Sequence, residues 1–173
     1  MGTATANLPR YAISNIDGVE VYKVGAECVI MLQPSSGFVS VQCPWHPELN
    51  GCHYWSARGA KTLKQFLVSL NKDYALGKLF NGNALTEFDR EKSQAKAMAT
   101  IIDLRRNRDI DAERARDLYE DVKNCQTPDD IARLDFDEPW YCIVNIEKSS
   151  VAWFWDEVWA AFANHLRTEL TGA

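Results

Sequence analysis

The hydrophobic period of this chain changes near residue 60, and this change constrains the fold most. Before it, β-branched or aromatic stretches at 11–14, 19–24, 28–32 and 38–43 alternate with turn-forming residues, a pattern typical of strands in an antiparallel meander. A further strand is expected at 52–55, after the proline-containing loop 44–51. Beyond residue 60, apolar residues recur every three or four positions, which predicts helices.

This order of elements predicts an α+β fold: an N-terminal antiparallel sheet of four to five strands, packed by helices. No repeat or linker separates two domains, so we expect a single domain over residues 1–173. Its expected regions are a strand-rich part at 10–56, a helical part at 60–135, and a strand plus C-terminal helix at 140–170. The helical part should include two helices between 60 and 80, a charged helical hairpin at 86–106 and 111–123, and a short helix from Thr127, an N-cap before Pro128. A strand is expected at 140–146, and Ser149 or Ser150 should cap a final helix that reaches about Leu170.

The charge balance disfavours direct nucleic-acid binding. The 173 residues include 24 acidic and 19 basic side chains, for a net charge of -5, whereas binding to phosphates calls for a basic surface. No apolar run approaches the ~18 residues that span a bilayer, and the N-terminal stretch lacks the apolar core of a signal peptide. We therefore expect a cytoplasmic protein without membrane contact, in which the five cysteines are reduced thiols.

The loop that ends the strand-rich region holds the best-localised candidate site. Cys43, His46, Cys52 and His53 lie within eleven residues, and thiolate and imidazole are the ligands that Zn²⁺ prefers. However, neighbours in a strand point to opposite faces, so Cys52 and His53 do not easily reach one ion. The alternative is a metal-free hairpin with Cys43 and Cys52 on neighbouring strands. A cysteine nucleophile with a histidine base is a further alternative, although no phosphate-binding loop or common catalytic motif is present.

Two other features point to protein–protein contact. On a helical wheel, Val151, Trp155, Val158, Phe162 and Leu166 form an apolar stripe, and Trp153 falls nearly opposite it. An aromatic residue in that position is a candidate partner contact, because tryptophan is enriched at interface hot spots; alternatively it covers a neighbouring loop.

The other feature is an acidic run made up of Asp129, Asp130, Asp135, Asp137 and Glu138. It could imitate the charge of DNA and occupy the basic groove of a nucleic-acid-binding protein. The alternative is an ordinary acidic helix start followed by a solvated loop.

Three segments carry a resemblance to a known group. They are Tyr54-Trp-Ser-Ala-Arg58-Gly59 leading into Leu63-Lys-Gln-Phe66-Leu67, Asp73-Tyr74 with Lys78-Leu79, and Trp153-Phe-Trp155-Asp-Glu-Val-Trp159. In these segments the chain resembles small accessory proteins that tailed phages and prophages encode. The resemblance implies a small protein that binds and disables a host enzyme or defence complex, and it assigns no residue a role.

We therefore expect a non-catalytic phage or prophage protein that binds and inhibits or modulates a host protein, possible targets including a nucleic-acid-handling defence complex. Trp153 and the acidic run are the expected contacts, and no cofactor is needed. One alternative is a zinc module or Cys/His enzyme centred on residues 43–53. Another is a structural or assembly protein of the phage particle, which would form stable homo-oligomers.

Overall fold

The described chain forms two compact units. The structure is a computed structural model that describes residues 13–16, 18–25, 28–56 and 58–172. Unit 1 comprises Met1–Leu85 and Glu147–Ala173, and unit 2 comprises Thr86–Ile146. Unit 2 is therefore an insertion in the sequence of unit 1. The expectation that residues 1–173 act as a single domain stays a prediction, since a division by contacts is not a measurement of folding cooperativity.

Unit 1 contains the predicted antiparallel meander. Its five strands follow each other in the sheet in sequence order, which confirms the predicted fold class. The strands are β1 (Ile13–Ile16), β2 (Val19–Val24), β3 (Cys28–Gln33), β4 (Phe38–Gln42) and β5 (Gly51–Tyr54). The first two residues of the strand expected at 11–14 lie outside the described residues.

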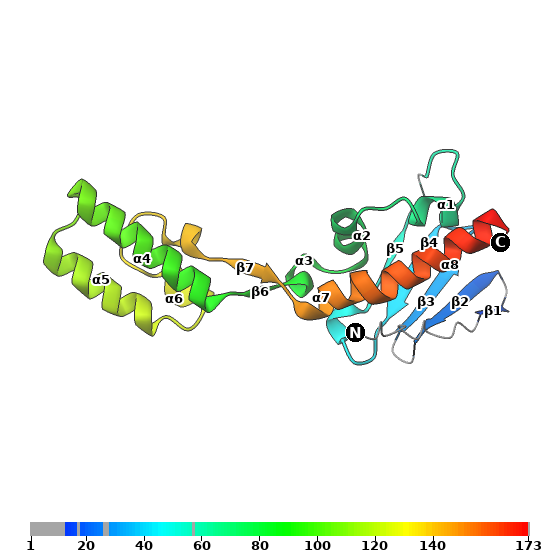
Figure 1. The fold of residues 1–173 in the computed structure, drawn as a ribbon, viewed down its shortest axis with the longest axis horizontal. Helices are drawn as coiled ribbons and strands as arrows, with labels where there is room; N and C mark the ends of the chain where they lie inside the picture. Colours follow the sequence, from blue (N-terminus) through cyan, green and yellow to red (C-terminus); the bar gives the residue numbers. More distant parts are fainter. Residues whose placement is uncertain (1–12, 17, 26–27, 57, 173) are drawn as a thin grey trace, which may run out of the picture. The chain divides into compact units, whose positions relative to one another are not determined.

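One face of this sheet forms the core of unit 1. Alternate residues of the strands, including Tyr22, Ile30, Leu32, Val39 and Val41, are fully buried, as expected for a sheet with one covered face. The long C-terminal helix runs across that face in Figure 1, and the ring of Phe162 lies 5.2 Å from that of Tyr22, centroid to centroid. This packing brings strands from the start of the chain against its last helix.

The C-terminal helix changes its winding in the middle. It comprises α7 (Ser149–Trp153), a π-helical segment η3 (Phe154–Trp159) and α8 (Ala160–Thr171), and its N-cap is Lys148 instead of the expected Ser149 or Ser150. A π-helix has i→i+5 hydrogen bonds, so the regular helical wheel misplaces residues along it. Phe154 is fully buried, whereas Trp155, a member of the predicted apolar stripe, is only partly buried.

Short helices follow the sheet in unit 1. They are α1 (Leu63–Leu67), α2 (Lys72–Leu79) and α3 (Gly82–Leu85), with a 3-10 turn η1 (Pro47–Leu49) before β5. Thr62 and Gln65 form a capping box at the start of α1. Gly51 lies so close to the backbone carbonyl of Leu79 that a β-carbon would clash with it. A glycine is therefore required where β5 passes the end of α2.

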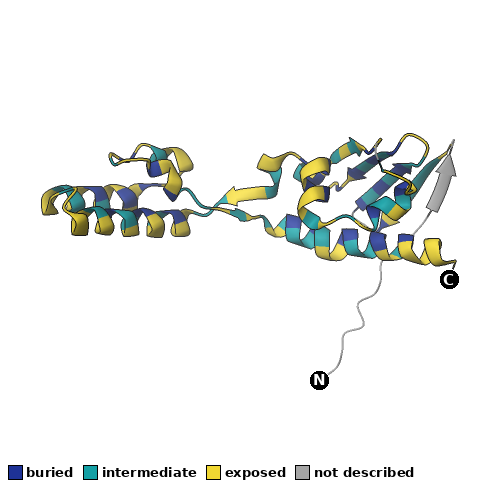
Figure 2. Ribbon diagram, turned by 90° about the horizontal axis from the view of Figure 1, so that it is seen from above, coloured by how far each residue is buried: buried dark blue, intermediate teal, exposed yellow. Residues whose placement is uncertain are grey.

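Unit 2 contains the predicted helical hairpin together with two short strands and two short helices. It consists of β6 (Thr86–Phe88), α4 (Arg90–Asn107), α5 (Ala112–Asn124), α6 (Pro128–Ala132), a 3-10 helix η2 (Pro139–Cys142) and β7 (Asn145–Glu147), the last residue of β7 belonging to unit 1. Strands β6 and β7 pair with each other. Buried residues including Ala97, Ile101, Leu118 and Ile131 form a core separate from that of unit 1. Figure 2 shows buried positions along α4 and α5 among many exposed ones.

Two secondary-structure expectations in unit 2 need correction. In the stretch expected as a strand at 140–146, residues 140–142 belong to the 3-10 helix η2, which begins at Pro139, and only Asn145 and Ile146 are in a strand, β7. The stretch 86–88, expected in the first helix of the hairpin, is strand β6, and α4 begins only after the cap Asp89.

Candidate protein-interaction site

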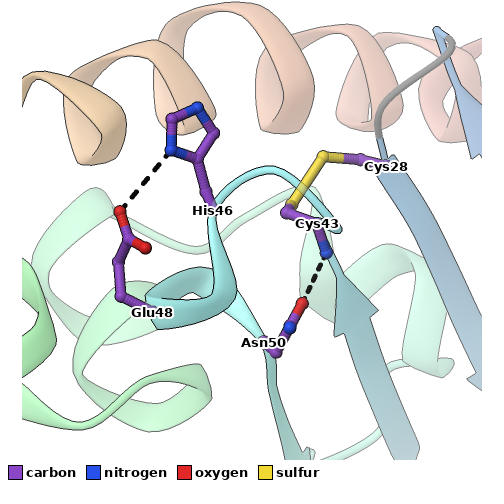
Figure 3. The surroundings of a disulfide bond; sticks show 5 residues. All are labelled: Cys28, Cys43, His46, Glu48 and Asn50. Carbon is purple, nitrogen blue, oxygen red and sulfur yellow. Dashed lines mark hydrogen bonds and ion pairs between the residues drawn. A yellow bond between two sulfur atoms is a disulfide. The ribbon is translucent and has the colours of Figure 1, made fainter.

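The loop proposed as a zinc site is organised by a disulfide. Cys43 pairs with Cys28, whose Cα lies 4.6 Å away, and both residues are buried. Figure 3 shows the bond with Asn50, whose side-chain oxygen accepts a hydrogen bond from the Cys43 backbone N–H at 2.6 Å. The expectation of five reduced cysteines is therefore wrong for Cys28 and Cys43. Sequence spacing did not point to this pair, because the strand register that joins β3 to β4 creates the proximity.

The four proposed zinc ligands do not come together. Cys43 is in the disulfide, while His46 lies 3.5 Å from Glu48. Cys52 pairs with Ser40 across the sheet and is exposed, while the adjacent His53 is partly buried with its ring 4.8 Å from that of Trp55. Burial, and secondarily the charge of Lys78, lowers the pKa of His53. Within the described residues, no group of three or more His, Cys, Asp or Glu side chains could hold a metal ion.

Trp153 packs against this loop. The rings of His46 and Trp153 lie 5.1 Å apart, and Trp153 contacts the core of unit 1 as a partly buried residue. Ser150 of the same helix donates a hydrogen bond to Glu48 at 2.9 Å. Trp153 thus covers a neighbouring loop. Trp45, which precedes His46 in that loop, is 75% exposed.

The acidic run lies in unit 2, and its members have different roles. Asp130 belongs to a capping box with Thr127 at the start of α6. Hydrogen bonds from the backbone N–H of Gln126 and from Thr127 lower the pKa of Asp130. Asp135 forms an ion pair with Arg114 of α5. Asp129, Asp137 and Glu138 are exposed, and none of these three forms an ion pair with a described residue.

Two exposed aromatic residues follow the acidic run directly. Trp140 is 52% and Tyr141 is 63% exposed, and their ring centroids lie 6.2 Å apart. The flanking Pro139 and Cys142 are buried, so η2 is anchored while its two aromatic side chains face solvent. The Sγ of Cys142 lies 3.6 Å from Thr100 Oγ1 on α4. We call Asp135, Asp137, Glu138, Trp140 and Tyr141 the acidic-aromatic segment.

The backbone at this segment is unusual. Glu138 has a φ of 50°, in the left-handed region. This conformation costs a non-glycine residue on the order of 1–2 kcal/mol, and such strain concentrates at functional sites. The turn directs the chain from the acidic residues into Pro139 and thereby presents the aromatic pair. Sequence analysis assigned Trp140 and Tyr141 to a strand and missed their exposure.

The net charge of the protein lies on unit 2, which contains this segment. Unit 2 contains 15 acidic and 10 basic residues, whereas the rest of the sequence contains nine of each. The whole net charge of -5 is therefore on unit 2. An acidic surface with exposed aromatic residues attracts and anchors a basic protein surface.

The comparisons with known proteins give one match. A family model described as a phage family matches residues 2–167. No curated protein matches this chain, and no solved structure matches it. No helix among the described residues is long and apolar enough to cross a membrane.

Proposed function

Because the chain belongs to this phage family, we propose that it is a non-catalytic accessory protein that binds a host protein and inhibits or modulates it. The observation that carries the proposal is the acidic-aromatic segment, where Trp140 and Tyr141 are exposed and follow the exposed carboxylates of Asp137 and Glu138 in the sequence. Large aromatic side chains dominate binding energy at protein interfaces. Surrounding charges favour association with an oppositely charged partner.

The chemistry of the segment defines the partner. A complementary surface has an apolar pocket for the aromatic pair, with Lys and Arg around it for the carboxylates. Nucleic-acid-binding proteins have such basic grooves, so a host complex that handles nucleic acid is the proposed class of target. Asp129 and Asp130, in the first turn of α6, add to the acidic character of this region, although Asp130 also belongs to the capping box of that helix.

Affinity capture from lysate of the bacterial host tests this proposal. The wild type and a Trp140→Ala/Tyr141→Ala variant are compared, with Trp45→Ala as a matched control, since Trp45 is exposed in unit 1. We expect one stoichiometric partner with the wild type and the control, loss of it with the double variant, and weaker capture at high salt because screening reduces charge attraction. Equal capture by the double variant would exclude the segment as the contact.

Trp153 is a second proposed contact, in unit 1. Its ring is partly buried against His46, so it offers less free surface than Trp140 or Tyr141. A Trp153→Ala arm in the same capture experiment separates the two surfaces. Retention of the partner by this variant would assign the contact to unit 2 alone.

A further inference from the structure

Unit 2 has a second surface of opposite character, an apolar groove between α4 and α5. The groove has a volume of about 320 Å³, and Ile102, Ala115 and Tyr119 contribute apolar side chains to it. Ile102 is 43% exposed, although isoleucine is a residue type that is usually buried. A cavity of about 150 Å³ already accommodates a benzene ring, so this groove has room for an aromatic side chain.

Three arginines line this groove. They are Arg105 and Arg106 on α4 and Arg116 on α5. Arg106 makes an ion pair with Asp103 at 3.2 Å, with both side chains largely exposed. Arg105 and Arg116 form no ion pair with any residue that the structure describes. On a unit with a net charge of -5, the groove is thus a local basic and apolar patch.

The groove and the acidic-aromatic segment are complementary in chemistry. The segment offers exposed aromatic rings and the carboxylates of Asp137 and Glu138, and the groove offers an apolar floor with the guanidinium groups of Arg105 and Arg116. Arginine binds carboxylates with two parallel hydrogen bonds and also stacks on aromatic faces. The negative charge of the segment thus matches the positive charge of the groove, and the aromatic rings of the segment match its apolar floor.

The two surfaces face away from each other within one molecule. On α4, Thr100 contacts Cys142 of η2, whereas Ile102 lines the groove. Residues two apart in a helix differ by about 200° around its axis. On α5, Arg114 pairs with Asp135 of the segment, while Arg116 lines the groove. Both helices therefore place the segment on one side of the hairpin and the groove on the other, and a chain cannot fill its own groove.

We infer that the groove binds the acidic-aromatic segment of a second copy of this chain. Trp140 or Tyr141 enters between Ile102 and Tyr119, and the carboxylates of Asp137 and Glu138 pair with Arg105 and Arg116. Such a contact joins two different surfaces, so it produces rings or open chains instead of a closed two-fold dimer. The inference goes beyond the proposed function, and it requires no host protein.

A charge-reversal experiment with the purified full-length chain tests this contact. The measurement is sedimentation velocity over a wide concentration range. We expect the wild type to form oligomers that dissociate at high salt. Two variants, Arg105→Glu/Arg116→Glu and Asp137→Lys/Glu138→Lys, should each lower the association constant at least about tenfold, since close charge pairs across an interface couple by 1.5 kcal/mol or more. Mixing the two variants should restore oligomers, because each then meets an oppositely charged surface.

The control is Lys92→Glu/Lys96→Glu, which changes the net charge as the arginine variant does, on exposed residues of α4 outside the groove. Circular dichroism checks that every variant keeps its helices. A wild type that stays monomeric overturns the inference, as does equal loss of association in the control. Failure of the mixture to recover oligomers also overturns it. None of these outcomes depends on capture of a host protein, so the proposed function is judged separately.

Discussion

The ammonium nitrogen of Lys64 lies 2.7 Å from a carboxylate oxygen of Glu169. The same nitrogen lies 2.7 Å from Glu20 Oε2 on β2, so one lysine joins α1 to the sheet and to α8. Tyr22 completes the cluster with a hydrogen bond from its hydroxyl to Glu20. Burial alone would lower the pKa of Lys64, but the hydrogen bonds that its ammonium donates to Glu169 and Glu20 outweigh this effect and raise that pKa.

We expect Lys64→Met to destabilise the protein by about 1–3 kcal/mol, the range for lost hydrogen bonds to charged groups. The substitution keeps most of the side-chain volume but leaves two partly buried carboxylates without their cation. Urea unfolding measures the change. Lys61→Met is the control, because Lys61 is exposed and its ammonium donates a hydrogen bond to the neutral hydroxyl of Ser69.

The same cluster predicts sensitivity to acid. Burial alone would raise the pKa of Glu169, but the hydrogen bond and charge of Lys64 outweigh it and lower that pKa below its usual value of 4.5. A carboxyl whose folded pKa is depressed contributes stability above its unfolded pKa and loses that contribution as pH falls through the folded pKa. The free energy of unfolding should therefore fall below about pH 4.5, and Lys64→Met should flatten this dependence. An unchanged slope in the variant would contradict the role of Lys64.

The disulfide should be measurable directly. We expect three titratable thiols among the five cysteines after unfolding without reductant, and five after reduction. The bridge spans 15 residues, for which the chain-entropy estimate is about 3 kcal/mol of stabilisation. Reductant should lower the stability of the wild type by that order and leave Cys28→Ser/Cys43→Ser unaffected. Five free thiols in the non-reduced protein would exclude the bond.

Two glycines should respond to alanine in opposite directions. Gly51→Ala introduces a β-carbon that clashes with the Leu79 carbonyl, and we expect it to cost about 1–3 kcal/mol, as overpacking does. Gly77 lies within α2 with open space around the β-carbon position. Gly77→Ala should therefore stabilise the protein by roughly 0.5–1 kcal/mol, because alanine favours the helix. Thermal unfolding of both variants measures the contrast.

Local patterns were enough to predict most of the fold. The β-branched or aromatic stretches at 19–24 and 28–32, set between turn-forming residues, marked strands, and Thr127-Pro128 marked the start of α6. These signals depend on residues that are close in sequence, so they can be recognised from a single sequence. The winding of the C-terminal helix was not predictable in this way, because its π-helical segment breaks the regular period.

The candidate site was predictable only in part. The acidic run was visible in the sequence, but the exposure of Trp140 and Tyr141 was not, since the aromatic and β-branched run at 140–146 also matches a strand. Pro139 was the signal for a turn there. The groove between α4 and α5 needs the packing of two helices, and the Cys28–Cys43 bond needs the register of two strands. Neither the packing of the two helices nor the register of the two strands is determined by residues that are close in sequence.

The separate cores of the two units lead to a last prediction. Leu118 is fully buried in the core of unit 2, and Leu118→Ala should cost about 2–5 kcal/mol, as large-to-small changes in cores do. We expect hydrogen exchange to accelerate within Thr86–Ile146 and to change little in the sheet of unit 1, because the lost contacts belong to unit 2 alone. Phe162→Ala, in the core of unit 1, is the reciprocal control. Accelerated exchange throughout the chain in both variants would show that residues 1–173 unfold as one cooperative domain.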